Sequence, residues 1–483
     1  MRTAALVALS AALALFALGL GCTKASTLGS TASRVSVPAA DEAPLMSIDA
    51  MISRAGTRSY WPNGANDWQA LSAADQQALI AASPACQDFV SFVFPADADD
   101  PAQLNKADVD QALRTDGALV IKGGQIVYEN YVGPYAGHPE KRHCMWSATK
   151  SFTTGMVGSI AEDSANGSGV LTPAGQPITL STRLGDMADL SAVSADPRLA
   201  NMTIEDVLSM NIPDPVWNEG YDGNIQTSNV VHMLYVDGPP DMAKYAASAL
   251  MGPAPATGPV NEFTYSSGNA VILMRVLQEL YGDDAFATLP WTQLFDRLGM
   301  TSAMLERDQR GVFVGSSYAH MTLRDMARFG YAYLNGGYFN GQQVIDPTFV
   351  QAARVIGAGM LAPGTTDSDI TEEGSFYSLG FWINPNPQVL QQQGIRSFGP
   401  TFPMTVDDAD AGVTANGLLP GSKFFPNTPV DMFFAAGHYG QNIMAFPEDD
   451  LLIVRMSHDS EYFSKLDRIN SKARACFLGA SGG

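Results

Sequence analysis

Residues 144–152 read CMWSATKSF, and Ser147 stands three positions before Lys150. Apolar residues at helical spacing follow, and Asn166 with Gly167 is typical of a helix end, so we expect a helix from about residue 147 to residue 163. Residues i and i+3 lie on one face of a helix, which places the two side chains on the same side. The pair is either a serine and a surface lysine of an ordinary helix, or a nucleophile with its base.

A serine hydroxyl becomes a nucleophile only with help from its surroundings. It needs a base that takes its proton, and it needs hydrogen-bond donors for the oxyanion that forms. Backbone N–H groups at a helix N-terminus favour a developing negative charge. A lysine can act as the base only while its amine is neutral, and burial favours the neutral amine. Because Ser-x-x-Lys also arises by chance, the motif alone favours a surface lysine.

Two segments far along the chain change this interpretation. Residues 263–270 read FTYSSGNA and contain Tyr265, and residues 435–442 read AAGHYGQN. The motifs follow the order S-x-x-K, Y-x-[NS], [KH]-x-G, and in this order the sequence resembles the penicillin-recognising serine hydrolases. That superfamily includes class C β-lactamases, D-Ala-D-Ala carboxypeptidases, family VIII esterases and 6-aminohexanoate-dimer hydrolases. The resemblance covers about residues 110–475 and is closest to the last two groups.

The resemblance implies a catalytic role for each matching residue. Ser147 matches the nucleophile, and Lys150 matches the general base that takes its proton. Tyr265 matches the tyrosine that relays a proton to the leaving group. The structural alternative for Tyr265 is a buried, hydrogen-bonded tyrosine of the core. The backbone N–H groups of Ser147 and Gln441 match the oxyanion hole.

Four further residues are expected to line the substrate site: Ser267, His438, Tyr439 and Gly440. The glycine lets a substrate approach the backbone closely. Ser267 stands where lactamases and peptidases often have an Asn that contacts a substrate amide. His438 stands where many have a Lys that attracts the carboxylate of β-lactams, and a mostly neutral histidine does so less well. Both departures disfavour an efficient β-lactamase and leave acyl transfer intact.

For two other groups of residues, a purely structural role is the alternative to a role in the site. Residues 217–223 read WNEGYDG and resemble the loop that borders the pocket in the closest branch, so Trp217 and Tyr221 are expected to contact substrate. An aromatic surface loop explains this segment as well. His138 and His143 flank Glu140, but no HExxH or HxH pattern accompanies them, so we expect a surface loop there and no metal site.

The strand and helix patterns predict one sheet built from both ends of the chain. Residues 117–131 read GALVIKGGQIVYENY, a hairpin with Gly-Gly at its turn, and strand patterns return in residues 377–383, 432–447 and 451–458. Residues 200–340 are mostly helical, and a last helix is expected over residues 460–478. With the resemblance, this predicts an α/β (α+β) fold of the β-lactamase/transpeptidase type. Its antiparallel sheet comes from both chain ends, is flanked by helices, and accompanies a mostly helical inserted subdomain.

The first 105 residues are expected to precede the hydrolase domain. An apolar run after Arg2 ends at Cys22, which is typical of a secretory signal and resembles a bacterial lipoprotein signal, so Cys22 is either lipidated or part of a plain secretory leader. We expect a signal over residues 1–22, a tether and N-terminal extension over 23–105, and the hydrolase domain over 106–483. The extension contains one expected helix, SAADQQALIAA, which begins after Ser72.

Composition limits the partners. The 49 acidic residues outnumber the 28 Lys and Arg residues, and the net charge of −21 argues against nucleic-acid backbones and anionic membrane surfaces. Membrane contact is expected only through a lipid anchor at Cys22, and the protein is expected to be periplasmic or lipid-anchored in a bacterial cell envelope. Export permits disulfides, and Cys86, Cys144 and Cys476 allow at most one internal pair. The pairing stays open, although Cys86 with Cys476 would join the two ends.

The sequence therefore predicts an exported serine hydrolase that cleaves an ester or amide bond of a small molecule through a covalent acyl-enzyme. Such chemistry needs no metal and no organic cofactor. One alternative is a β-lactamase or D-Ala-D-Ala carboxypeptidase on the same machinery. Another is a non-catalytic binding protein of the cell envelope, against which the intact set of Ser147, Lys150 and Tyr265 argues.

Overall fold

The computed structural model describes residues 45–57, 69–95, 113–220, 225–365, 376–385, 425, 427–459 and 463–479. The predictions that fall outside these residues are the signal with Cys22, nearly all of the tether, and the role of Tyr221.

A seven-stranded sheet lies at the centre of the described fold, in the order β10-β11-β12-β13-β14-β1-β2 with every neighbouring pair antiparallel. Its strands are β1 (Thr115–Lys122), β2 (Gln125–Tyr131), β10 (Phe376–Tyr377), β11 (Trp382–Ile383), β12 (Phe433–Gly437), β13 (Gln441–Phe446) and β14 (Leu451–Ser457). β1 pairs with β14 along its length, with Leu119 opposite Val454. The prediction of one sheet from both chain ends is therefore confirmed.

The hairpin of β1 and β2 turns at the predicted glycine pair. Gly123 and Gly124 have φ angles of 60° and 84°, a left-handed conformation that glycine adopts without steric cost. Most residues of β1 and all of β14 are buried, because both strands lie inside the sheet and are covered on both faces.

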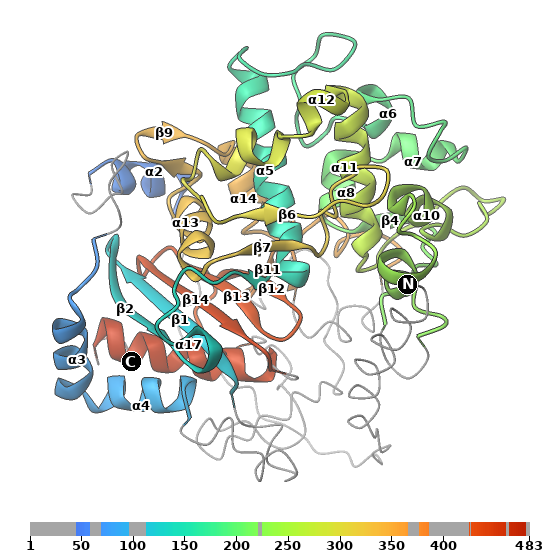
Figure 1. Ribbon diagram of the computed structural model, residues 1–483. Helices are drawn as coiled ribbons and strands as arrows, with labels where there is room; N and C mark the ends of the chain where they lie inside the picture. The colour runs from blue at the N-terminus through green and yellow to red at the C-terminus, as the bar shows by residue number, and fades with distance from the viewer. Residues whose placement is uncertain are drawn as a thin grey trace, which may run out of the picture.

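Helices cover both faces of the sheet (Figure 1). On one face, α13 (Leu323–Leu334) packs against β13 and β14, and α5 (Thr149–Ala165) packs its Phe152 ring against Phe329 of α13. On the other face, α17 (Phe463–Leu478) lies beside α4 (Pro84–Val93), and Tyr128 of β2 contacts rings from both of these helices. The final helix and the helix after Ser147 are thus confirmed, and they lie on opposite sides of the sheet.

The described part of the N-terminal extension has three helices, so the expectation of a single helix is wrong. These are α2 (Ile48–Gly56), α3 (Ala73–Ala82) and α4. Ser72 caps α3 as predicted. The other two also begin at a capping serine, Ser47 for α2 and Ser83 for α4, and both bury residues against the rest of the fold, such as the fully buried Phe89. A disulfide joins Cys86 of α4 to Cys476 of α17, which was one of the open pairings.

In the segment between β2 and β10, which includes residues 200–340 that were expected to be mostly helical, helices outnumber strands. Its elements are η3 (Gly133–Tyr135), β3 (His143–Cys144), η4 (Trp146–Ala148), α5, α6 (Leu184–Met187), α7 (Pro197–Asn201), α8 (Ile204–Leu208), β4 (Asn211–Pro213), α9 (Asn229–Val231), η5 (His232–Val236), α10 (Met242–Ala249), β5 (Asn261–Phe263), α11 (Ser267–Tyr281), α12 (Asp283–Phe286), η6 (Trp291–Phe295), β6 (Met304–Leu305), β7 (Ala319–Met321), α13, β8 (Tyr338–Phe339), β9 (Gln342–Gln343) and α14 (Pro347–Ala352).

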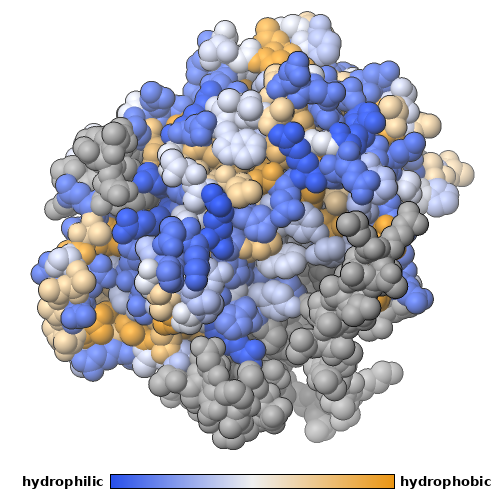
Figure 2. Space-filling view, in the orientation of Figure 1, coloured by the Kyte–Doolittle hydropathy of each residue, from blue (hydrophilic) through white to orange (hydrophobic). Residues whose placement is uncertain are grey.

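The surface mixes polar and apolar residues, as Figure 2 shows for one face. Apolar residues gather at the lower left of that view, where Figure 1 places α3 and α4. α3 buries none of its residues, so its apolar side chains contribute to this surface. Among the described helices, none combines the length and the hydropathy that a bilayer-spanning helix requires.

Candidate active site

Ser147 lies in the turn that leads into α5. The expected helix start is a 3₁₀ turn, η4, and the α-helix itself begins at Thr149. Trp146 has a φ of 45°, a left-handed conformation that costs a non-glycine residue about 1–2 kcal/mol. The chain therefore holds a strained turn immediately before Ser147, which is half-buried.

Lys150 is buried within hydrogen-bond distance of Ser147. The residue is only 3 % exposed, so the alternative of a surface lysine is excluded. Its Nζ lies 3.1 Å from Ser147 Oγ, 3.0 Å from Ser267 Oγ and 3.4 Å from the Ser316 carbonyl oxygen. The first turn of α5 thus brings the two residues of the S-x-x-K motif together, as their spacing predicts.

Tyr265 follows β5 and comes two residues before α11, where its ring faces the lysine. The ring centroid lies 4.7 Å from Lys150 Nζ. Trp382 of β11 stacks on the ring with centroids 5.5 Å apart, and Tyr377 of β10 meets it edge-on at 5.6 Å. Strands β10 and β11, at the edge of the main sheet, therefore hold Tyr265 beside Lys150, although both strands are far from these two residues in sequence.

Ser267 is the first residue of α11, is 1 % exposed, and accepts its hydrogen bond from Lys150. Beside it lies Glu219, a carboxylate that was not among the predicted site residues. Glu219 Oε1 accepts from the Ser267 hydroxyl at 2.5 Å, and Oε2 accepts from the Ser267 N–H at 2.9 Å. Glu219 lies inside the WNEGYDG segment, where its place between aromatic residues was the signal available in the sequence.

Trp217 supports this carboxylate. Its indole N–H donates to Glu219 Oε2 at 2.7 Å, and the residue is 6 % exposed. Its ring also packs against the start of α11, because a Cβ added to Gly268 would lie 3.0 Å from Trp217 Cζ3. An aromatic surface loop is therefore excluded for Trp217. Tyr221, its expected partner at the pocket, is outside the described residues.

His438, Tyr439 and Gly440 form the turn between β12 and β13. The Gly440 N–H donates to the Gly437 carbonyl at 3.0 Å, and Tyr439 and Gly440 have φ angles of 64° and 84°. Glycine is thus required at position 440 by the turn itself, in addition to the substrate access expected from the sequence.

This turn lies against the one that carries Ser147. A Cβ added to Gly437 would lie 2.0 Å from the Met145 carbonyl oxygen and 3.1 Å from the Ala148 nitrogen. The Trp146 ring meets the His438 ring edge-on, with centroids 5.9 Å apart. The end of β12 and the start of α5 are therefore in direct contact, next to the turn that leads to Gln441, whose N–H is expected to share the oxyanion hole with that of Ser147.

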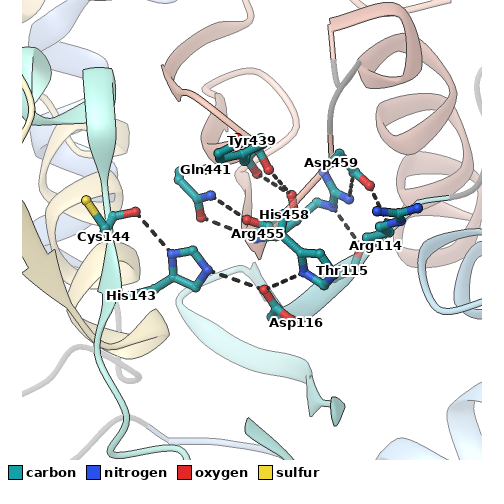
Figure 3. A network of polar contacts seen from close by, with 12 residues as sticks. Arg114, Thr115, Asp116, His143, Cys144, Tyr439, Gln441, Arg455, His458 and Asp459 are labelled. Atoms are coloured by element: carbon teal, nitrogen blue, oxygen red, sulfur yellow. Dashed lines mark hydrogen bonds and ion pairs between the residues drawn. The ribbon is translucent and has the colours of Figure 1, made fainter. Parts of the chain in front are cut away.

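A polar network from β14 holds the 438–440 turn (Figure 3). Gln441, the first residue of β13, is fully buried, and its side chain donates to the Ser457 carbonyl at 2.5 Å and accepts from the Ser457 N–H at 3.2 Å. The Ser457 hydroxyl and the Asp459 N–H both donate to the Tyr439 carbonyl, at 2.5 Å and 3.0 Å. These bonds stabilise the left-handed conformation of Tyr439.

Figure 3 also shows Asp116, which lies between two histidines. Burial alone would raise the pKa of Asp116, but hydrogen bonds from His143 Nε2 at 3.3 Å and His458 Nδ1 at 3.1 Å lower it. His143 is therefore half-buried and bound to a carboxylate, so a surface loop was the wrong prediction for it. His138 and Glu140 are exposed, as expected. Within the described residues, no group of three His, Cys, Asp or Glu side chains is arranged to hold a metal ion.

Burial holds two side chains near the site neutral. It lowers the pKa of His438 from 6.5 to about 4, so this imidazole carries no charge at neutral pH. Burial also raises the pKa of the free thiol of Cys144 to about 11. His438 therefore does not supply the positive charge that a lysine at position 438 would bring to a substrate carboxylate.

Comparisons with known proteins agree with the fold and with the motifs. A family model described as Beta-lactamase matches residues 97–474, most of the chain. The chain is 27 % identical over 293 residues to 6-aminohexanoate-dimer hydrolase of Paenarthrobacter ureafaciens, covering 58 % of this chain and 67 % of that protein. A solved structure from Bacillus anthracis, also described as a 6-aminohexanoate-dimer hydrolase, superposes with a TM-score of 0.52 at 19 % identity, covering 76 % and 79 % of the two chains.

The structural likeness shows a shared fold of the β-lactamase/transpeptidase type, and the family model shows the membership. The chain belongs to the β-lactamase family and is a serine hydrolase related to 6-aminohexanoate-dimer hydrolase.

Proposed function

We propose that this enzyme hydrolyses a small-molecule ester or amide through a covalent acyl-enzyme on Ser147. The observation that carries the proposal is the buried Lys150 amine 3.1 Å from the Ser147 hydroxyl, with the Tyr265 ring beside the same amine. A nucleophile within hydrogen-bond reach of its base is the arrangement that activated serines share.

In the proposed reaction, Ser147 Oγ attacks the carbonyl carbon while Lys150 Nζ takes the hydroxyl proton. Backbone N–H groups of Ser147 and Gln441 stabilise the oxyanion of the tetrahedral intermediate. As the intermediate collapses, the proton passes through Tyr265 to the leaving alcohol or amine. Water then attacks the acyl carbonyl and gives up one proton to Tyr265. A proton returns through Lys150 to Ser147 Oγ as the ester bond breaks, and the acid is released.

The surroundings of the proposed site favour a substrate without a carboxylate near the 438–440 turn. His438 is neutral at physiological pH, and Glu219 adds a carboxylate beside Ser267, which contacts Lys150. A related enzyme is named for 6-aminohexanoate dimer, so this dimer belongs in the substrate panel together with simple esters.

The test combines labelling with a substrate panel. We expect a fluorophosphonate probe to label the wild type and not Ser147→Ala, with the added mass found on the peptide that contains residue 147. Short acyl esters and 6-aminohexanoate dimer are expected to be turned over faster than a chromogenic cephalosporin. Equal labelling of Ser147→Ala would remove Ser147 from the mechanism, and faster cephalosporin turnover would favour the β-lactamase alternative.

We also propose that the protein is exported, with Cys22 as either a lipidation site or part of a plain leader. The apolar N-terminal run supports this, and so does the disulfide between Cys86 and Cys476, because disulfides persist in oxidising compartments. Cell fractionation with metabolic palmitate labelling tests it. Recovery of the full-length, unlabelled chain in the cytoplasm would contradict export.

A further inference from the structure

We propose that Tyr235 is a specificity-determining residue that binds an apolar group of the substrate at the entrance to Ser147. With Tyr318, Tyr439 and Trp146 it forms a set of rings that we call the aromatic entrance. The inference rests on the proposed function and deepens it, because it names the substrate class of the same serine.

A π-helical turn holds Tyr235 in an exposed position. η5 buries the side chains of Met233 and Leu234, whereas Tyr235 and Val236 are 41 % and 51 % exposed. A π-helical turn is rare in proteins and occurs often at functional sites. A single exposed aromatic residue is ordinary, so the neighbours of Tyr235 decide whether it has a role.

The first neighbour, Tyr318, connects Tyr235 to the proposed general base. The centroids of the two rings are 6.3 Å apart. Two residues before Tyr318, the carbonyl oxygen of Ser316 lies 3.4 Å from Lys150 Nζ. Tyr235 therefore packs on the segment that contacts the proposed base.

The second neighbour, Cys144, precedes Ser147 by three residues. Its Sγ lies 3.7 Å from the carbonyl oxygen of Ser317, in the same segment. Burial raises the pKa of Tyr235, and the neighbouring Cys144 raises it further. Tyr235 is therefore also close to the strand that leads to the proposed nucleophile.

Two further rings come from the turns around Ser147. Trp146, the residue before it, meets the Tyr439 ring edge-on with centroids 6.5 Å apart, and both residues are half-buried. Burial raises the pKa of Tyr439, and the neighbouring Tyr235 raises it further. Rings from η5, from the segment before β7 and from the 438–440 turn thus gather beside the half-buried Ser147.

These rings suit an uncharged, apolar part of a substrate. Sites for small molecules are lined mostly by apolar and aromatic side chains, which gain free energy by burying apolar surface of the ligand. His438, whose ring centroid is 4.0 Å from that of Tyr439, is neutral at physiological pH and attracts no anion. The substrate class is therefore an ester or amide with an aliphatic chain or an aromatic ring close to the scissile bond.

Of the four residues, Tyr235 is the one whose replacement separates binding from chemistry. Trp146 and Tyr439 belong to the turns that hold Ser147, so replacing them would also disturb the nucleophile. Tyr235 is exposed and belongs to a different element. We expect its ring to bind substrate and transition state equally, which lowers KM and leaves kcat unchanged.

The experiment measures hydrolysis of two ester series in a pH-stat. One series varies the acid, with methyl acetate, methyl hexanoate and methyl benzoate, and the other varies the alcohol, with methyl, hexyl and benzyl acetate. In at least one series, Tyr235→Ala is expected to lower kcat/KM of the large esters about 10-fold, mostly by raising KM, and to change that of methyl acetate less than about 2-fold. An equal change for small and large esters in both series would overturn the inference.

Two variants serve as controls. Tyr235→Phe keeps the ring and is expected to stay within about 2-fold of the wild type for every ester. Leu171→Ala removes another apolar side chain of similar exposure, 40 %, which follows the end of α5 that is remote from Ser147, and it should keep the wild-type selectivity. A selective loss as large as that of Tyr235→Ala in either control would overturn the inference.

If Tyr235→Ala fails to fold in a thermal melt, Tyr235→Lys carries the test. Its ammonium group is expected to raise kcat/KM for monomethyl succinate, an anionic ester, relative to methyl hexanoate by at least about 5-fold. An unchanged ratio would overturn the inference.

Ser147→Ala separates this inference from the proposed function. Loss of all ester hydrolysis in Ser147→Ala, together with wild-type selectivity in Tyr235→Ala, would overturn the role of Tyr235 and leave the proposed function standing. Undiminished hydrolysis by Ser147→Ala would overturn both.

Discussion

His438 shows how burial of a single side chain affects this enzyme. Its pKa of about 4 lies below the ordinary value of 6.5, so between these values the unfolded chain binds a proton that the folded chain does not. Stability therefore rises with pH across this window, and the contribution of the neutral imidazole is lost as the pH falls through it. The ring also packs against Trp146 and Tyr439, next to the proposed nucleophile.

We expect the difference in unfolding free energy between the wild type and His438→Gln to change with pH. From pH 7.5 to pH 5, the wild type should lose about 2 kcal/mol relative to the variant, which cannot titrate at this position. Urea unfolding of both proteins at the two pH values measures this. A constant difference would mean that His438 titrates normally in the folded protein.

At the scale of elements, the active site depends on how closely β12 approaches the turn before α5. Gly437 ends β12, and a Cβ there would lie 2.0 Å from the Met145 carbonyl oxygen, well inside van der Waals contact. Backbone atoms cannot rotate away as a flexible side chain can. An alanine at this position must therefore push the two elements apart.

Gly437→Ala is thus expected to destabilise the fold by about 1–3 kcal/mol and to slow fluorophosphonate labelling of Ser147 at least about 10-fold in the folded enzyme. Thermal melts and labelling rates measure the two effects. Gly56→Ala is the control, because a Cβ at Gly56 meets no atom within 4 Å. Labelling of Gly437→Ala at the wild-type rate would show that the separation of β12 from η4 does not matter to the nucleophile.

For the whole molecule, the disulfide connects helices from the two ends of the chain. Cys86 of α4 and Cys476 of α17 are 390 residues apart in sequence, and their helices lie on the face of the sheet opposite α5 and α13 (Figure 1). The bond should therefore stabilise the fold without direct influence on Ser147. Its removal increases the conformational freedom of the unfolded chain more than that of the folded chain.

We expect the double variant Cys86→Ala/Cys476→Ala to lose about 2–5 kcal/mol of unfolding free energy while its folded form keeps the wild-type labelling rate. Chemical unfolding and labelling at low temperature measure the two. A reductant should lower the melting temperature of the wild type and leave that of the double variant unchanged. Cys144→Ala, which removes the free thiol, is the control and should remain sensitive to the reductant.

Several features could be read from the sequence because they depend on residues that are close along the chain. The spacing of Ser147 and Lys150, the Gly-Gly turn and the cap at Ser72 all act within about one helical turn or one hairpin. The alternating and apolar strand patterns at both ends also predicted the sheet, since strand pairing follows from burial of one or both faces. With the family resemblance, the sequence by itself determined the fold, the enzyme class and the expected catalytic residues.

Only the tertiary structure decided which distant groups meet. Glu219 contacts Ser267 across 48 residues, and no local rule links a loop carboxylate to the first residue of a helix. The same holds for the contact of the half-buried His143 with Asp116, and for the pairing of Cys86 with Cys476. These contacts depend on how the whole chain fills its core, and that is a property of the packed molecule rather than of any short stretch of sequence.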